Sequence, residues 1–358
     1  MSSQPDRPTQ PDLRTPQWVD ASVRGMLVGL ALGNSVASWD RWLIPAGVAS
    51  QLAAFTADGL IRGSISLDNG GADDLPTFLW AGLQRWAACQ GIETRESFLL
   101  EELVAGHPTG WLAQVPALRE RRGSAPATVK ALANGPTHSL GSHGMVRTLP
   151  LAAAYRTGPP TSDLMPIAGL VATTAQQVTA TKEAVSCAVA ATMVAAMAGD
   201  EQYGDVDLAE LVRIILTLGP LAGSEVADLL KLAIETADTH PGDRRVFQEL
   251  GGHRTAPVTL AAAVFAAASH PRVEHFTTAV RLAALSPDGA SAAALTGAIL
   301  GSRHGIHALP ADLVARHELG WVMDGLGRDI CQQLTTYPGG NRGGRPALPG
   351  WLAKYPRS

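Results

Sequence analysis

GMLVGLALGN, residues 25–34, is the segment whose pattern most directly predicts a helix in this chain. Its apolar residues continue a series that begins just before it, at spacings of three and four: Val23, Met26, Leu27, Leu30 and Ala31. Side chains at these spacings share one face of an α-helix, so this face is expected to be buried. Asp20 is suited to cap the start of the helix, and Gly33 to end it.

The same helical pattern continues along most of the chain. Comparable stretches lie at residues 79–88, 97–105, 115–121, 145–155, 163–177, 182–198, 208–218, 225–236, 258–269, 276–285, 291–302, 311–317 and 319–334. Alanine, the strongest helix former, is the commonest residue, and alternating strand patterns are nearly absent. Only the short stretch 61–67 fits either a helix or a strand. The sequence therefore predicts an all-α protein.

The organisation of the chain favours one large domain between two tails. Apolar residues make up 46% of the 358 residues, which is enough for a sizeable core. Pro and Gly clusters separate the helices, without a dividing linker or a convincing repeat. We expect a disordered tail over 1–17, the helical domain over 18–336, and a tail over 337–358 with too much Gly and Pro for a helix. Three side chains are placed to dock this last tail: Trp351, Leu352 and Tyr355.

Charge and targeting signals exclude several classes of protein. The net charge of −4 provides no basic field for nucleic acid or anionic lipid. The longest apolar runs are too short to cross a bilayer, and the polar N-terminus lacks the apolar part of a secretory signal. The three cysteines form no zinc pattern, which favours reduced thiols. We expect a soluble cytoplasmic protein without nucleic-acid or membrane partners.

Three other segments follow residues 25–34 in a recognisable order. They are FTADG at 55–59, GSHGMVRTLP at 141–150, and SPDGAS at 286–291 followed by LTGAILG at 295–301. In this order and spacing the chain resembles the ADP-ribosylglycohydrolase family, which includes the dinitrogenase-reductase-activating glycohydrolases. The resemblance covers most of the chain, from about residue 22 to residue 334.

This resemblance implies a large single-domain orthogonal helical bundle of the ADP-ribosylglycohydrolase type. In such enzymes two Mg²⁺ or Mn²⁺ ions in a central cleft are held by carboxylates and by Ser or Thr hydroxyls. The ions orient ADP-ribose and water for hydrolysis of a glycosidic bond. Hard divalent cations bind oxygen ligands, and a pair of them needs several carboxylates to balance the charge.

The metal-ligand positions of the family are only partly kept in this chain. The resemblance places suitable oxygens at four of them: Thr56, Asp58, Asp288 and Ser291. Ala57 and Ala290 stand where the family has aspartate, and the family's Thr-His segment is VTAT here, without histidine. We therefore expect no cofactor, or Mg²⁺ or Mn²⁺ in a residual site, with Asp58 and Asp288 catalytic if activity remains. The alternative for both aspartates is helix capping.

Arg41 aligns with a glutamate that follows the family's opening helix, although the adjacent Asp40 leaves this register open by one residue. Unpaired carboxylates in a cleft repel one another, so a cation in place of the metals is physically reasonable. A guanidinium is permanently charged and can bridge two carboxylates. We predict that Arg41 replaces the metal by pairing with Asp58, Asp288 or both. The alternative places Arg41 in solvent and Asp40 in the cleft.

The loop at 141–147 is the predicted ligand-binding segment, through Gly141, Ser142, His143, Gly144 and Arg147. Its small residues permit close approach of a ligand to the backbone, and main-chain N–H groups before a helix suit phosphate. The Arg147 guanidinium is able to add a bidentate contact. The alternatives are a surface position for His143 and, for Arg147, a role in the structure of the loop itself.

The missing carboxylates lead to two main hypotheses about function. The first is a pseudoenzyme that lacks the binuclear metal centre and binds a nucleotide such as ADP-ribose or a protein partner. The alternative is a divergent but active ADP-ribosyl hydrolase that uses one metal or none. A purely structural role without a small ligand is the third hypothesis. Metal content after purification, with a thermal-shift assay on ADP-ribose, distinguishes them.

Overall fold

The computed structural model describes residues 16–95, 108–157, 164–200, 203–217, 224–341 and 344–356. Across these ranges the chain forms α-helices and short 3-10 turns, with isolated β-bridges and no strand. The all-α prediction is confirmed, and the ambiguous stretch 61–67 is helical. The helix expected at 97–105 and most of the expected N-terminal tail lie outside the described residues.

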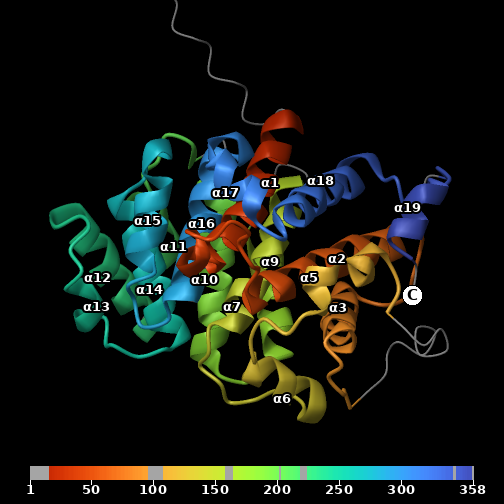
Figure 1. Cartoon of the computed structure of the whole chain (residues 1–358), viewed down its shortest axis with the longest axis horizontal. Helices are drawn as coiled ribbons and strands as arrows, with labels where there is room; N and C mark the ends of the chain where they lie inside the picture. Colours follow the sequence, from red (N-terminus) through yellow and green to blue (C-terminus); the bar gives the residue numbers. More distant parts are fainter. Residues whose placement is uncertain are drawn as a thin grey trace, which may run out of the picture.

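The helices are arranged as a bundle in which α12 to α15 lie at one side and α2, α3 and α19 at the other (Figure 1). Their bounds are α1 (Pro16–Asn34), α2 (Val48–Asp68), α3 (Leu75–Cys89), α5 (Pro116–Arg119), α6 (Pro126–Asn134), α7 (His143–Thr148), α8 (Ala152–Thr157), α9 (Met165–Gln176), α10 (Lys182–Ala198), α11 (Leu208–Leu216), α12 (Glu225–Thr239), α13 (Val246–Glu249), α14 (Ala256–Ser269), α15 (Phe276–Ala283), α16 (Gly289–His304), α17 (Ala311–Arg316), α18 (Gly320–Thr336) and α19 (Pro349–Lys354). None of those in the described ranges combines the length and apolar character needed to span a bilayer.

Two helices from distant parts of the chain meet at backbone distance. α1 and α16 pack against each other with Gly29 opposite Gly297, where a Cβ on either residue would lie 2.1 Å from the carbonyl oxygen of the other. One turn away, Gly25 and Gly301 face each other at a similar separation. The glycines at a spacing of four therefore set how closely α1 and α16 approach. This contact fixes α16, which carries two candidate site residues at its start.

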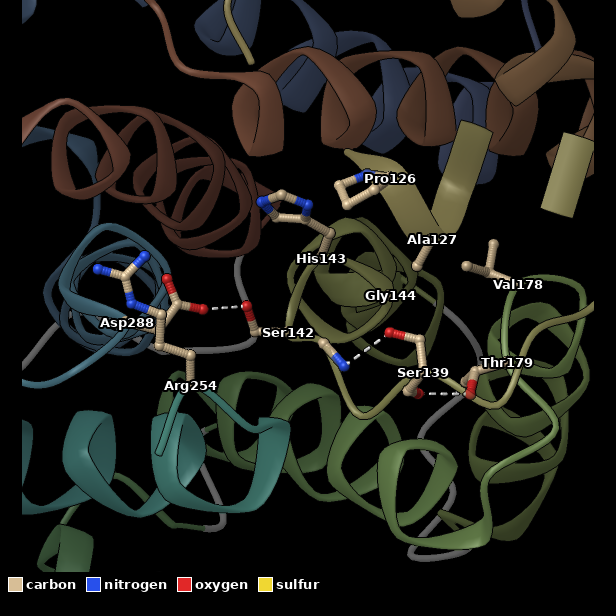
Figure 2. Close-up of a pocket in the computed structure, with 11 residues that line it drawn as sticks. Pro126, Ala127, Ser139, Ser142, His143, Gly144, Val178, Thr179, Arg254 and Asp288 are labelled. Atoms are coloured by element: carbon tan, nitrogen blue, oxygen red, sulfur yellow. Dashed lines mark hydrogen bonds between the residues drawn. The ribbon is translucent and has the colours of Figure 1, made fainter. Parts of the chain in front are cut away.

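Most of the loop predicted at 141–147 is helical, since α7 begins at His143. This short helix is held among larger ones. α7 packs on α2, α9 and α10, and both α7 and α10 pack on α16. This packing brings the loop before α7 next to the N-terminal end of α16 (Figure 2). Residues 142 and 288, far apart in the sequence, consequently lie together.

Two helix ends differ from the prediction. α1 begins at Pro16, so Asp20 is not the cap residue but lies inside the helix and pairs with Arg24 at 2.8 Å. Proline suits the first helical position because its missing N–H would have no partner there. The predicted tail at 337–358 is not free of helix, since Pro349 opens the short helix α19 for the same reason.

The docking predicted for the C-terminal segment is confirmed. Tyr355 is fully buried, and its hydroxyl donates a hydrogen bond to the Asp329 carboxylate on α18. Trp351 and Leu352 are half-buried against the hydrophobic core. The aromatic and aliphatic side chains thus hold this segment to the bundle despite its Gly and Pro content.

A buried histidine makes the stability of the fold depend on pH. His317 is 3% exposed; its Nδ1 accepts a hydrogen bond from the Leu319 N–H at 3.1 Å, and its Nε2 lies 3.1 Å from Ser35 Oγ. Burial lowers the pKa of His317 to about 4, against about 6.5 in an unfolded chain. The imidazole therefore takes up a proton more readily when the chain unfolds.

We predict that His317 contributes stability above about pH 6.5 that is lost as the pH falls toward about 4, on the order of 3 kcal/mol in total. Urea unfolding between these pH values is expected to show a smaller pH dependence for His317→Gln than for the natural chain. His253→Gln, at an exposed histidine, serves as the control. An unchanged pH dependence in His317→Gln would contradict the prediction.

Candidate functional site

A pocket of about 290 Å³ lies between the loop before α7 and the start of α16 (Figure 2). Residues 141 and 142 come from this loop, and residues 143 and 144 come from the first turn of α7. Asp288 precedes α16, and Thr179 and Arg254 come from two further segments. We call this cavity the Ser142 pocket. Four of the five residues predicted to bind ligand, and one of the two predicted catalytic aspartates, therefore line a single cavity.

Hydroxyl and carboxylate groups lie close together at the N-terminal end of α16. The Ser142 hydroxyl donates a hydrogen bond to Asp288 Oδ2, and it shares a hydrogen bond of 2.9 Å with Ser291 Oγ. Asp288 occupies the N-cap position of α16, but its side chain makes no capping hydrogen bond. The carboxylate of Asp288 is thus directed to Ser142, and helix capping does not explain it.

His143 and Arg254 supply the nitrogen groups of the Ser142 pocket. Burial lowers the pKa of His143, while the charge of Asp288 acts in the opposite direction, so the imidazole is neutral at pH 7. Arg254 is exposed, and Figure 2 shows its side chain extending toward the same end of the pocket as Asp288. The Ala256 N–H donates to the Leu140 carbonyl at 2.6 Å, which ties the Arg254 segment to the loop before α7.

Arg147 does not line the Ser142 pocket, which corrects its predicted contact with ligand. The side chain is fully buried, and its Nη2 donates a hydrogen bond to the Thr174 carbonyl on α9. Burial lowers the pKa of Arg147 to about 9, so the guanidinium remains charged at pH 7. Arg147 therefore serves the packing of α7 against α9, as the alternative for this residue proposed.

Asp58 lies away from the Ser142 pocket, in the interior of α2. Its Oδ2 is 2.9 Å from Arg62 Nε and 3.0 Å from Arg85 Nη2, and all three side chains are 1% exposed. Thr56 is also buried, and its hydroxyl donates to the Leu52 carbonyl of the same helix at 3.0 Å. Because α2 begins at Val48, neither residue caps a helix, and neither lines the pocket.

Arg41 forms no ion pair with Asp58 or Asp288 among the described residues, which corrects the prediction that it replaces a metal there. Its side chain is exposed, and so is that of Asp40, so neither register places a charged group beside the buried carboxylate. The cations beside Asp58 are instead Arg62 and Arg85. Arg62 stands four residues after Asp58 on one helix, a spacing that brings side chains together and was visible in the sequence.

The residues of this site do not fit two divalent metal ions. Paired hard cations need several carboxylates, whereas Asp288 is the one carboxylate among the residues that line the Ser142 pocket. Asp58, the other aspartate that the resemblance places at a metal-ligand position, is buried against two guanidinium groups. In the part of the chain that the structure describes, no three His, Cys, Asp or Glu side chains come together as a metal site.

Comparisons with known proteins agree with the helical architecture. The family model described as ADP-ribosylglycohydrolase matches residues 15–339. Among solved structures, the chain is similar to one titled "ADP-ribosylglycohydrolase-related protein complex", with a TM-score of 0.56 and 18% sequence identity over 88% of this chain and 99% of that chain. At this identity the likeness shows the fold alone. The search of curated proteins gives no match.

Proposed function

The chain belongs to the ADP-ribosylglycohydrolase family, and we propose that it is a pseudoenzyme of that family. In this proposal the Ser142 pocket binds a nucleotide such as ADP-ribose without the binuclear metal centre. The observation that carries the proposal is the set of acidic groups: one carboxylate, Asp288, lines the pocket, and Asp58 is buried against Arg62 and Arg85.

The chemistry of glycosidic hydrolysis supports the loss of activity. Metal-independent glycosidases use a pair of carboxyl groups, one as an acid and one as a base or nucleophile. Asp288 has no second carboxylate beside it among the pocket-lining residues, and its Oδ2 already accepts a hydrogen bond from Ser142. His143, neutral at pH 7, is a weak acid for a leaving group. The pocket therefore lacks the paired groups that either catalytic route requires.

The same groups are suited to recognise a phosphorylated sugar. The Asp288 carboxylate can accept hydrogen bonds from ribose hydroxyls, and the Arg254 guanidinium matches phosphate oxygens. The pocket volume of about 290 Å³ lies at the low end of the usual range for small-molecule sites. We therefore place one ribose phosphate unit of the nucleotide in the Ser142 pocket, with the remainder extending along its rim toward Arg254.

We predict that ADP-ribose binds with the same affinity in EDTA and in Mn²⁺, because the pocket residues, not a metal, make the contacts. Isothermal titration calorimetry measures this directly. Asp288→Asn is expected to weaken binding about tenfold, equivalent to about 1.4 kcal/mol. Ser142→Trp fills the pocket and is expected to abolish binding. Thr336→Trp, on the exposed end of α18, is the control and leaves the affinity unchanged.

An enzyme assay separates this proposal from the alternative of a divergent hydrolase. ADP-ribosylated arginine and serine peptides are expected to remain intact at protein concentrations that saturate ADP-ribose binding. Release of ADP-ribose that disappears in Asp288→Asn would contradict the pseudoenzyme and support the hydrolase. Binding that requires Mn²⁺ would contradict the metal-free site.

A further inference from the structure

A second groove, of about 520 Å³, lies beside α15 and is separate from the Ser142 pocket in its lining residues. Arg244 and Gly242 come from the segment after α12, His270 from the end of α14, and Arg281, Leu282 and Leu285 from α15 and the turn that follows it. The groove therefore combines two guanidinium groups with an apolar wall. No residue of this groove was predicted as a site from the sequence.

The side chains that line the groove carry positive charge and no negative charge. Its lining contains no Asp or Glu, and neither Arg244 nor Arg281 forms an ion pair with a carboxylate of the described residues. The acid nearest in sequence, Asp243, accepts hydrogen bonds from Arg245 at 2.9 and 2.7 Å. Its charge is thus balanced outside the groove. The two lining arginines remain able to pair with an external anion.

Packing contacts restrict two of the residues that line the groove. The Arg281 guanidinium lies over the Trp39 ring, 5.7 Å from its centroid, and the Trp39 indole N–H donates to the Leu32 carbonyl at 3.0 Å. A buried aromatic ring under a guanidinium restricts its orientation. In the segment after α12, Gly242 has a positive φ of 77° and lies against His270, where a Cβ would be 3.4 Å from Nε2.

His270 adds a polar but neutral group. Burial lowers its pKa, and the ring of His275, with centroids 5.8 Å apart, lowers it further. The positive charge of the groove at pH 7 therefore comes from Arg244 and Arg281. Leu285 is 51% exposed and also lines the groove, so an apolar surface is present next to these charges.

We infer that this groove binds a small organic phosphate, with the phosphate between Arg244 and Arg281 and the apolar part on Leu285. A guanidinium presents paired N–H donors that match phosphate oxygens, and two of them lining one groove can hold one phosphate dianion. The open leucine surface favours a phosphate ester with an aromatic or aliphatic group over inorganic phosphate. This inference does not depend on the proposed function of the Ser142 pocket.

Phenyl phosphate is the probe for this groove, because it joins a dianion to an apolar ring. Calorimetric titration of the full chain is expected to detect binding of phenyl phosphate and none of benzyl alcohol, the neutral counterpart. Arg244→Gln with Arg281→Gln is expected to weaken binding at least tenfold. Arg328→Gln makes the same kind of charge change on the exposed face of α18, and is expected to leave the affinity unchanged.

The two pockets are distinguished by crossing the variants and the ligands. Ser142→Trp should retain phenyl phosphate binding, and the double arginine variant should retain ADP-ribose binding if the Ser142 pocket functions as proposed. If the circular dichroism spectrum shows that the double variant does not fold, Arg244→Gln alone, a change at an exposed residue, is titrated in its place. The inference is overturned by no binding at about 10 mM probe, by arginine variants of unchanged affinity, or by loss of binding in Ser142→Trp.

Discussion

Gly297→Ala is expected to prevent α1 and α16 from packing closely and to destabilise the chain by about 3 kcal/mol, the upper end for overpacking. The added methyl group would lie 2.1 Å from the Gly29 carbonyl oxygen and 2.8 Å from its carbonyl carbon. These are backbone atoms in a helix, so no side-chain rotation relieves the overlap. Only a separation of the two helices does so, and that opens the core between them. Urea unfolding followed by circular dichroism measures the loss.

The sign of this effect makes the prediction specific. Alanine is a better helix former than glycine by about 1 kcal/mol, so propensity alone would make Gly297→Ala stabilising. Gly169→Ala is the matched control, because Gly169 lies in helix α9, is exposed, and has no atom within 4 Å of an added Cβ. We expect this control to stabilise slightly. A Gly297→Ala variant as stable as Gly169→Ala would show that the close crossing is absent.

The fold was largely predictable because its signals are local and ordered. Helical periodicity and alanine content indicate the helices without reference to their partners, and the glycines of residues 25–34 and 295–301 lie in the segments that carry the family resemblance. The four-residue spacing of Gly25 and Gly29 already marks a helix face on which another backbone can approach. The pattern alone does not show that α16 is the helix that packs on this face, because that depends on the tertiary structure.

The boundaries of α2 show where local reasoning failed. Helix capping was the alternative for Asp58, in FTADG at 55–59, yet α2 runs through this segment from Val48 to Asp68. The preceding residues are mostly apolar and alanine-rich, so the helix begins earlier. Gly59 lies inside α2, where α3 approaches closely: an added Cβ would lie 2.7 Å from the Phe78 carbonyl oxygen. This glycine serves helix packing instead of a turn.

The candidate site was predictable where its residues share a motif. Ser142, His143 and Asp288 belong to the recognised segments, and the structure brings them into one pocket. Arg85 and Arg254 were missed because no motif surrounds them, and their positions depend on how α3 and the segment before α14 pack. Guanidinium groups do lie beside Asp58, but they belong to Arg62 and Arg85. The alignment indicated Arg41, which is exposed.

Asp58→Ala is expected to destabilise the chain by about 3–5 kcal/mol, because it leaves buried guanidinium groups without their shared carboxylate. Arg62 and Arg85 contact Asp58 Oδ2 at 2.9 and 3.0 Å, and water does not reach any of the three side chains to an appreciable extent. Urea unfolding at pH 7 measures the difference. Asp228→Ala, which breaks the exposed pair between Asp228 and Lys231, is the control and should cost less than about 1 kcal/mol.

A double-mutant cycle then tests whether the charges are coupled. Asp58→Leu with Arg85→Leu removes both a negative and a positive charge and fills the space with apolar groups, so it should be less destabilising than the sum of the single variants.

A metal ligand would behave differently. If Asp58 held Mn²⁺, the ion would raise the unfolding temperature of the natural chain through its binding energy, and Asp58→Ala would remove that increase. Equal unfolding temperatures in Mn²⁺ and EDTA, together with a large cost of Asp58→Ala, would show that the carboxylate stabilises the fold through arginine in place of metal.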